Sequence, residues 1–176
     1  WRAMQAGEIS ERDYCATRSR EVGRLLGEAW PQMQTLVQRA RGAEPAAVIR
    51  PEALAAVRAV KAAGLRLAIL SNELDLFYGA DFRARLPLLD QFDPIVDATY
   101  TGVLKPDPRA YAQVAQGLGL PLEDCLFVDD QPRNVAGALA AGMPALDFDV
   151  THPGASYRAA LQHLGLPLPA ELETVA

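Results

Sequence analysis

The chain has 176 residues, a formal net charge of −5, half of its residues apolar and 22% charged. This length suits one well-buried domain with a small appendage. The acidic balance argues against a surface for nucleic acids or anionic membranes, which would need clustered Lys and Arg. No apolar run approaches the roughly 18 residues of a membrane span, and no signal peptide is visible. We therefore expect a cytoplasmic protein whose cysteines, Cys15 and Cys125, are reduced.

Residues 1–48 are predicted to contain helices only. A capping box that starts at Ser10 opens a helix over about 10–27. A second helix is expected over about 31–41, with a proline in its first turn. A polar break at 42–44 then separates this helical segment from the rest of the chain.

From Pro51 onward, the pattern changes to strands that alternate with helices. The predicted helices are 51–63, 106–118 and 132–141, the predicted strands are 65–70, 94–98, 125–129 and 144–148, and short helical pieces cover 73–92. Glycines follow two of the helices as C-terminal caps. This alternation predicts an α/β fold in which helices cover both faces of a parallel sheet.

Two of the predicted loops bring polar residues to the carboxyl ends of the strands, where ligands of such sheets gather. Ser71 and Asn72 end the run LAILSN. The hydroxyl could donate to a phosphoryl oxygen, although an isolated Ser-Asn pair is more often a helix cap or a turn. Lys105, one of only two lysines, lies in the loop GVLKPDP. It could reach an anion there, or be a surface lysine.

A third segment, CLFVDDQ, ends in the adjacent acids Asp129 and Asp130. Either acid could cap the helix that begins at Pro132, because negative charge is favourable at a helix N-terminus. However, two carboxylates at a buried strand end repel each other without a cation, and Mg²⁺ prefers oxygen ligands of this kind. We therefore predict that at least one acid binds Mg²⁺, while Asn134 could orient an acid or a loop.

The order and spacing of these segments resemble the haloacid dehalogenase-like hydrolase superfamily over about residues 50–150. The run LSN is similar to its second motif, the Lys-Pro of GVLKPDP to its third, and FVDDQPRNVAGALAAGM to its fourth. Residues 1–48 resemble the tail of the helical cap that members insert after the first motif. The adjacent acids are similar to the phosphatase branch, which includes sugar-phosphate phosphatases and the phosphatase domain of soluble epoxide hydrolases.

The resemblance implies a Rossmann-like core over residues 49–176 and a role for each candidate side chain. Ser71 would hydrogen-bond the transferring phosphoryl group, with Asn72 on the same phosphate or substrate side. Lys105 would neutralise the charge of that group, and Asp129, with Asp130 less directly, would hold Mg²⁺. The substrate would be a small phosphorylated metabolite, hydrolysed through an aspartyl-phosphate intermediate.

The first motif of the family, an apolar strand that ends in two aspartates one residue apart, is not found before the helical segment. Its first aspartate would attack phosphorus, and its second would act as general acid and base. We expect this motif upstream of Trp1, on a strand between those that end at Ser71 and Asp129. Without it, a gap of roughly 10 Å would separate two strand edges. Asp147 and Asp149 reproduce the spacing but follow the fourth motif, so we do not assign them this role.

Two other functions stay open at this point. A 2-haloacid dehalogenase uses the same nucleophile without a metal, although the resemblance implies that such enzymes lack the adjacent acid pair. A catalytically silent binding or regulatory domain would fit a chain whose first motif is missing or lacks aspartate.

Overall fold

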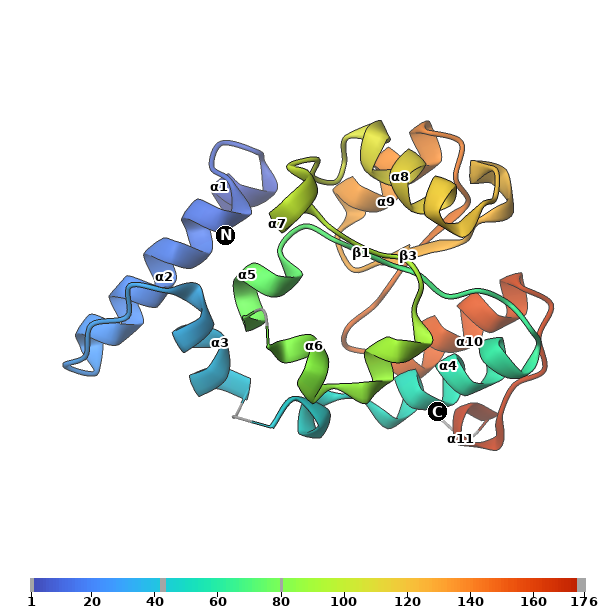
Figure 1. Cartoon of the computed structure of the whole chain (residues 1–176), viewed down its shortest axis with the longest axis horizontal. Helices are drawn as coiled ribbons and strands as arrows, with labels where there is room; N and C mark the ends of the chain where they lie inside the picture. Colours follow the sequence, from blue (N-terminus) through green and yellow to red (C-terminus); the bar gives the residue numbers. More distant parts are fainter. Residues whose placement is uncertain (1, 42–43, 80, 174–176) are drawn as a thin grey trace. The chain divides into compact units, whose positions relative to one another are not determined.

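The structure is a computed structural model that describes residues 2–41, 44–79 and 81–173 (Figure 1). The chain divides into two compact units. The first comprises Trp1–Val48 and Glu73–Leu86, and the second comprises Ile49–Asn72 and Pro87–Ala176. All residues to which the sequence analysis assigns chemistry belong to the second unit. Within the described ranges, no helix is long and apolar enough to span a bilayer.

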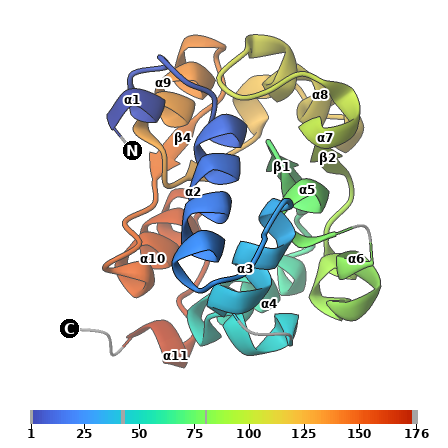
Figure 2. The same ribbon diagram turned by 90° about the vertical axis from the view of Figure 1, so that its left-hand side faces the viewer.

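The first unit is helical in its described residues. Its elements are α1 (Arg2–Gln5), α2 (Glu11–Leu25), α3 (Met33–Arg41), the 3-10 helix η1 (Pro45–Val48), α5 (Leu74–Tyr78) and α6 (Phe82–Arg85). Helix α3 packs against α2 and α5, and α6 packs against η1 (Figure 2). These contacts explain why residues 73–86 group with the first unit, although the sequence analysis places them in the core. The predicted break at 42–44 lies outside the described residues apart from Glu44.

The predicted cap of α2 is confirmed. The hydroxyl of Ser10 accepts a hydrogen bond from the backbone N–H of Asp13 at 3.0 Å, which satisfies one of the free donors of the first helical turn. Near the other end, a side chain on Gly23 would meet Trp30 atoms at 2.8 Å, so glycine lets the buried indole pack against α2. Trp30 is therefore a packing residue of this unit.

The second unit confirms the predicted alternation of helices and strands, with shorter strands than expected. Its elements are α4 (Pro51–Ala62), β1 (Ile69–Ser71), η2 (Pro87–Gln91), β2 (Ile95–Asp97), α7 (Ala98–Thr101), α8 (Pro108–Leu118), η3 (Leu122–Asp124), β3 (Phe127–Asp129), α9 (Pro132–Ala140), β4 (Ala145–Asp147), α10 (Pro153–His163) and α11 (Ala170–Glu173). Helices α10 and α11 were not predicted from the sequence. Helices α8 and α9 lie on one side of the strands, and α4 and α10 lie on the other (Figure 1).

The strands form two separate parallel pairs rather than one sheet. In the part of the chain that the structure describes, β1 pairs only with β2 and β3 pairs only with β4. The strands of the second and fourth motifs are thus not paired with each other. The strand of the first motif is expected between them from the sequence.

The backbone hydrogen bonds show which edge of each pair faces away from its partner. Ile69 donates to the carbonyl of Pro94 at 3.0 Å, so it faces β2, and Phe127 donates to the carbonyl of Pro144 at 2.8 Å, so it faces β4. Successive residues of a strand direct their backbone groups to opposite edges. The backbone N–H and C=O groups of Leu70 therefore point to the edge of β1 that faces away from β2. Those of Val128 point to the edge of β3 that faces away from β4.

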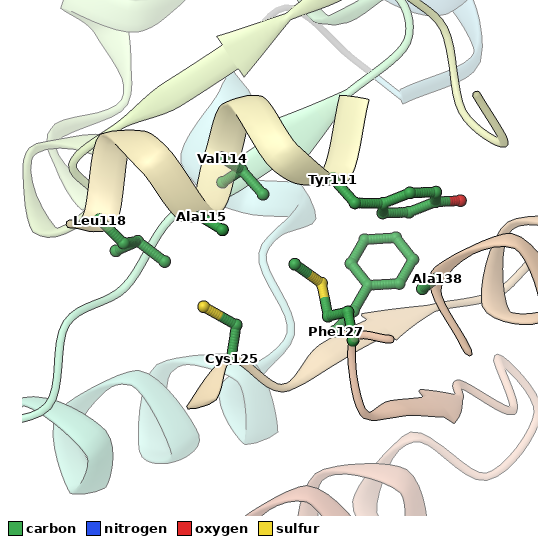
Figure 3. Packing of buried hydrophobic residues seen from close by; sticks show 8 residues of the cluster. Tyr111, Val114, Ala115, Leu118, Cys125, Phe127 and Ala138 are labelled. Carbon is green, nitrogen blue, oxygen red and sulfur yellow. The ribbon is translucent and has the colours of Figure 1, made fainter. Parts of the chain in front are cut away.

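Two apolar clusters pack in the second unit. One gathers residues of α8, β3 and α9, including the free thiol of Cys125 (Figure 3). The other joins α4, α10 and α11. In the first cluster, the rings of Tyr111 and Phe127 meet edge to face, with their centroids 5.4 Å apart. This arrangement adds a directional contact to the apolar burial that fixes α8 on β3.

Tyr111 is the polar member of this cluster. Its side chain is fully buried, and its hydroxyl donates to the backbone carbonyl of Asn134 at 2.7 Å. Burial, and to a lesser extent the charge of Asp129, raises the pKa of Tyr111 from 10.0 to about 12. The folded state therefore favours the neutral phenol.

We expect Tyr111 to make stability fall at high pH. Because its pKa is higher in the folded protein, its contribution is complete below pH 10.0 and is lost as the pH rises through about 12. This rise in the pKa of Tyr111 corresponds to about 2–3 kcal/mol in the free energy of unfolding. Urea unfolding of the wild type and of Tyr111→Phe between pH 8 and 11 measures the effect. The wild type should lose more stability than the variant, and parallel pH profiles would contradict the assignment.

Candidate active site

Lys105 brings the ends of the two strand pairs together. It lies in the loop between α7 and α8, and its ammonium donates to the carbonyl of Leu70 in β1 at 2.9 Å. The same ammonium forms an ion pair with Oδ2 of Asp129, the last residue of β3, at 2.7 Å. Three segments that are far apart in the sequence therefore meet at one cation, as the motif order predicts.

The ion pair between Lys105 and Asp129 is shielded from solvent. Both side chains are 9% exposed, and the Lys105 ammonium also lies 5.3 Å from the centre of the Phe127 ring. Such a pair is stable only when good geometry and further hydrogen bonds offset the loss of hydration. The carbonyl of Leu70 and the aromatic face supply these contacts to the ammonium.

Asp129 is held on its other oxygen as well. Its Oδ1 accepts from the backbone N–H of Gln131 and from the side-chain amide of Asn134, each at 2.9 Å. Three donors therefore surround one carboxylate at the start of α9. The hydrogen bond from Asn134 to Asp129 agrees with the expectation that Asn134 could orient an acid.

Ser71 and Asn72 leave β1 beside this ion pair. Ser71 is the last residue of the strand and is half-buried. Asn72 directs its side-chain amide to Lys105: Oδ1 accepts from the Lys105 backbone N–H at 2.7 Å, and Nδ2 donates to the Lys105 carbonyl at 3.3 Å. The second and third motifs are thus joined by a pair of hydrogen bonds as well as by the Lys105 ammonium.

The oxygen atoms around Asp129 are of the type that Mg²⁺ binds. Asp130 is exposed, and Asn134 is 2% exposed with its Oδ1 lacking a hydrogen-bond partner among the described residues. Carboxylate and amide oxygens of this kind suit Mg²⁺, whereas both oxygens of Asp129 already accept from Lys105, Gln131 and Asn134. Across the described ranges, however, no three His, Cys, Asp or Glu side chains are grouped to hold a metal. Waters or substrate oxygens would have to complete the shell.

Asp147 and Asp149 lie outside this arrangement of side chains. Asp147 ends β4, on the side of β3 that is already paired. Asp149 accepts from the hydroxyl of Thr151 at 2.6 Å and lies 2.9 Å from Nδ1 of His152. These hydrogen bonds, that of Thr151 foremost, hold the pKa of Asp149 well below its usual range. The Asp149 side chain thus organises the turn before α10.

A feature of the site that sequence reasoning missed is the close packing of the Lys105 loop on α9. A side chain at Gly137 would meet Pro106 Cβ at 2.6 Å, the Pro106 carbonyl at 3.1 Å and the Tyr111 hydroxyl at 2.9 Å. Only glycine leaves room for the loop at this position. An isolated glycine inside a predicted helix is the signal that could have indicated this contact.

A profile of a family described as haloacid dehalogenase-like hydrolase matches residues 17–142, well over half of the chain. The chain belongs to this family. The match includes Ser71, Lys105 and Asp129, so it confirms the resemblance carried by the three motifs.

Curated relatives of this chain include proteins with phosphatase and dehalogenase names. Phosphatase MT3486 of Mycobacterium tuberculosis is 36% identical over 99 residues, which cover 56% of this chain and 46% of the relative. Phosphoglycolate phosphatase of Rhodospirillum rubrum is 36% identical over 103 residues, covering 57% and 41%. Haloacetate dehalogenase H-2 of a Moraxella species is 32% identical over 97 residues, covering 52% and 41%. The matched segments span less than half the length of each relative.

Solved structures confirm the fold. An uncharacterized protein from Corynebacterium glutamicum matches with a TM-score of 0.59 and 26% identity, over 69% of this chain and 90% of that one. A hydrolase of the same family from Entamoeba histolytica matches with a TM-score of 0.55 and 21% identity, over 96% and 70%. The chain therefore has the α/β fold of haloacid dehalogenase-like hydrolases.

We expect Gly137→Ala to destabilise the protein, although alanine is the better helix former. Helix propensity favours alanine by about 1 kcal/mol, whereas forcing a methyl group into a packed site costs about 1–3 kcal/mol. The contacts with Pro106 and Tyr111 make the second effect the larger one. Urea unfolding measures the balance, and Ala136→Gly, at an exposed position of the same helix, calibrates the propensity. A variant more stable than the wild type would contradict the packing argument.

Proposed function

We propose that this chain is part of a Mg²⁺-dependent phosphatase that acts on a small phosphorylated metabolite. The observation that carries the proposal is the buried cation of Lys105, 2.7 Å from Asp129 and at the strand end that also bears Ser71. A fixed cation, a hydroxyl at the end of β1 and a pair of acids at the end of β3 suit a transferring phosphoryl group. The phosphatase names of two relatives support the same chemistry.

Each residue of the site has a distinct task in this proposal. The Lys105 ammonium balances negative charge that develops on the phosphoryl oxygens, and the Ser71 hydroxyl donates to one of them. Asp129 and Asp130 would hold Mg²⁺, with Asn134 fixing the orientation of Asp129. The metal, when bound, would supply further positive charge to the phosphoryl oxygens.

The nucleophile in this proposal lies on the strand of the first motif, between β1 and β3. The edge of Val128 opposite β4 supports this placement, whereas on the edge opposite β2 the Leu70 carbonyl accepts from the Lys105 ammonium. An aspartate on that strand would attack phosphorus while the ester bond to the leaving oxygen breaks and a second aspartate protonates that oxygen. Water would then cleave the aspartyl-phosphate, releasing inorganic phosphate and regenerating the carboxylate.

Haloacetate hydrolysis is the second candidate, because one relative is named a haloacetate dehalogenase. The acid pair argues against it: a halide leaving group needs no divalent cation, whereas Asp129 and the exposed Asp130 form part of an oxygen donor set. A catalytically silent domain stays as a third candidate.

We expect the protein that includes the first-motif strand to release phosphate from p-nitrophenyl phosphate only when Mg²⁺ is present. Halide release from chloroacetate, measured in parallel, should stay at the background rate. The distinction follows from the charge of the phosphoryl group, which the metal and Lys105 would neutralise together. Metal-independent halide release would favour the dehalogenase, and neither activity would favour the silent domain.

Two matched variants make this assay specific. Asp129→Asn should abolish the metal-dependent turnover, whereas Asp147→Asn, at the exposed end of β4, should leave it unchanged. Equal turnover in the wild type and in Asp129→Asn would refute the role of Asp129.

A further inference from the structure

We propose that Asn72 is a positioning residue that fixes Lys105, rather than a ligand of the substrate. The inference concerns the geometry of Lys105 and stands on hydrogen bonds within the second unit. Its consequence for turnover rests on the proposed phosphatase function, whereas the geometry can be tested without any activity.

The contact between Asn72 and Lys105 is a two-point clamp on one residue. A side-chain amide offers one acceptor oxygen and two N–H donors. Asn72 uses the oxygen on the Lys105 N–H at 2.7 Å and the nitrogen on the Lys105 carbonyl at 3.3 Å. The peptide groups on both sides of the Lys105 Cα are therefore held by the same side chain.

This clamp explains how a flexible side chain is held at one place. The lysine stem has four carbons and about 2 kcal/mol of rotamer entropy to lose. At its tip, Lys105 is held by Leu70 and Asp129, and at its base it is held by Asn72. The next residue of the loop, Pro106, packs so closely on α9 that only Gly137 fits there. The ammonium is thus preorganised before any anion arrives.

The clamp also couples the second and third motifs. Asn72 directly follows Ser71, the last residue of β1. Through the Asn72 side chain, the end of β1 is therefore hydrogen-bonded to the backbone of Lys105. The Ser71 backbone and the Lys105 backbone cannot shift independently while both hydrogen bonds of Asn72 persist. The backbone positions that carry the Ser71 hydroxyl and the Lys105 ammonium, two groups that would contact the same phosphoryl oxygens, are therefore fixed relative to each other.

The two lysines of the chain give a direct readout of this geometry. Lys61 is exposed on α4, whereas the Lys105 side chain is 9% exposed and ion-paired. Reductive methylation with formaldehyde, followed by peptide mass spectrometry, reports the reactivity of each amine. We expect wild-type Lys105 to react slowly. In Asn72→Ala it should react about tenfold faster, because local opening becomes easier, while Lys61 keeps its rate.

Three further variants separate positioning from general destabilisation. Asn72→Asp keeps the oxygen that accepts from Lys105 and should restore part of the protection, and it replaces the alanine variant if that one does not fold. Asp129→Asn removes the negative charge that pairs with the Lys105 ammonium and should therefore also raise the methylation rate of Lys105. Ser156→Ala loses a buried hydroxyl that bonds the backbone of Asp149 at 2.9 Å, away from Lys105, and should leave Lys105 protected.

Kinetics of the protein that carries the first-motif strand complete the test. A positioning role predicts that Asn72→Ala lowers kcat by about tenfold or more with little change in KM, because the charge of Lys105 is misplaced only in the transition state. A raised KM with unchanged kcat, or Lys105 reactivity equal to that of the wild type, would overturn the proposal. If the protein has no phosphatase activity, methylation alone still decides whether Asn72 fixes Lys105.

Discussion

The buried ion pair between Lys105 and Asp129 is the contact on which the architecture of the site depends. The Leu70 carbonyl faces the edge opposite β2, where the backbone N–H of a neighbouring strand would bind it in a continuous parallel sheet. Here the ammonium of Lys105 binds it and reaches Asp129 at the end of the other strand pair. One cation thus joins two strand pairs that share no backbone pairing in the described part of the chain.

The surroundings of this pair explain why two charges tolerate burial there. Asp129 receives three donors, and Lys105 is held by two acceptors at its tip and by the Asn72 clamp at its base. Replacing a partner of the ammonium or of the carboxylate would leave a desolvated charge partly unpaired, which costs more than the pair itself contributes. The same satisfied network places a fixed positive charge beside Ser71, so folding and the proposed chemistry depend on the same contacts.

The sequence predicted the residues that meet but not how they meet. Ser71, Lys105 and Asp129 were predictable because each follows a strand or lies in a Gly- and Pro-rich loop, and carboxyl ends of parallel strands share one edge. The Asn72 clamp and the close approach at Gly137 were not predictable. Each joins residues more than 30 positions apart, Asn72 to Lys105 and Gly137 to Pro106, whose contact depends on packing. Helix α10 was not predicted, although Pro153 at its first position is the same kind of start signal as Pro51 and Pro132 in the predicted helices.

A double-mutant cycle of Lys105→Met and Asp129→Asn, followed by urea unfolding of this chain, tests the central claim most directly. Each single change should cost about 3–5 kcal/mol, because it leaves one buried group without its partner. The double variant should cost clearly less than the sum, with a coupling free energy of about 1–3 kcal/mol. Additive effects would show that Lys105 and Asp129 do not hold the two strand pairs together.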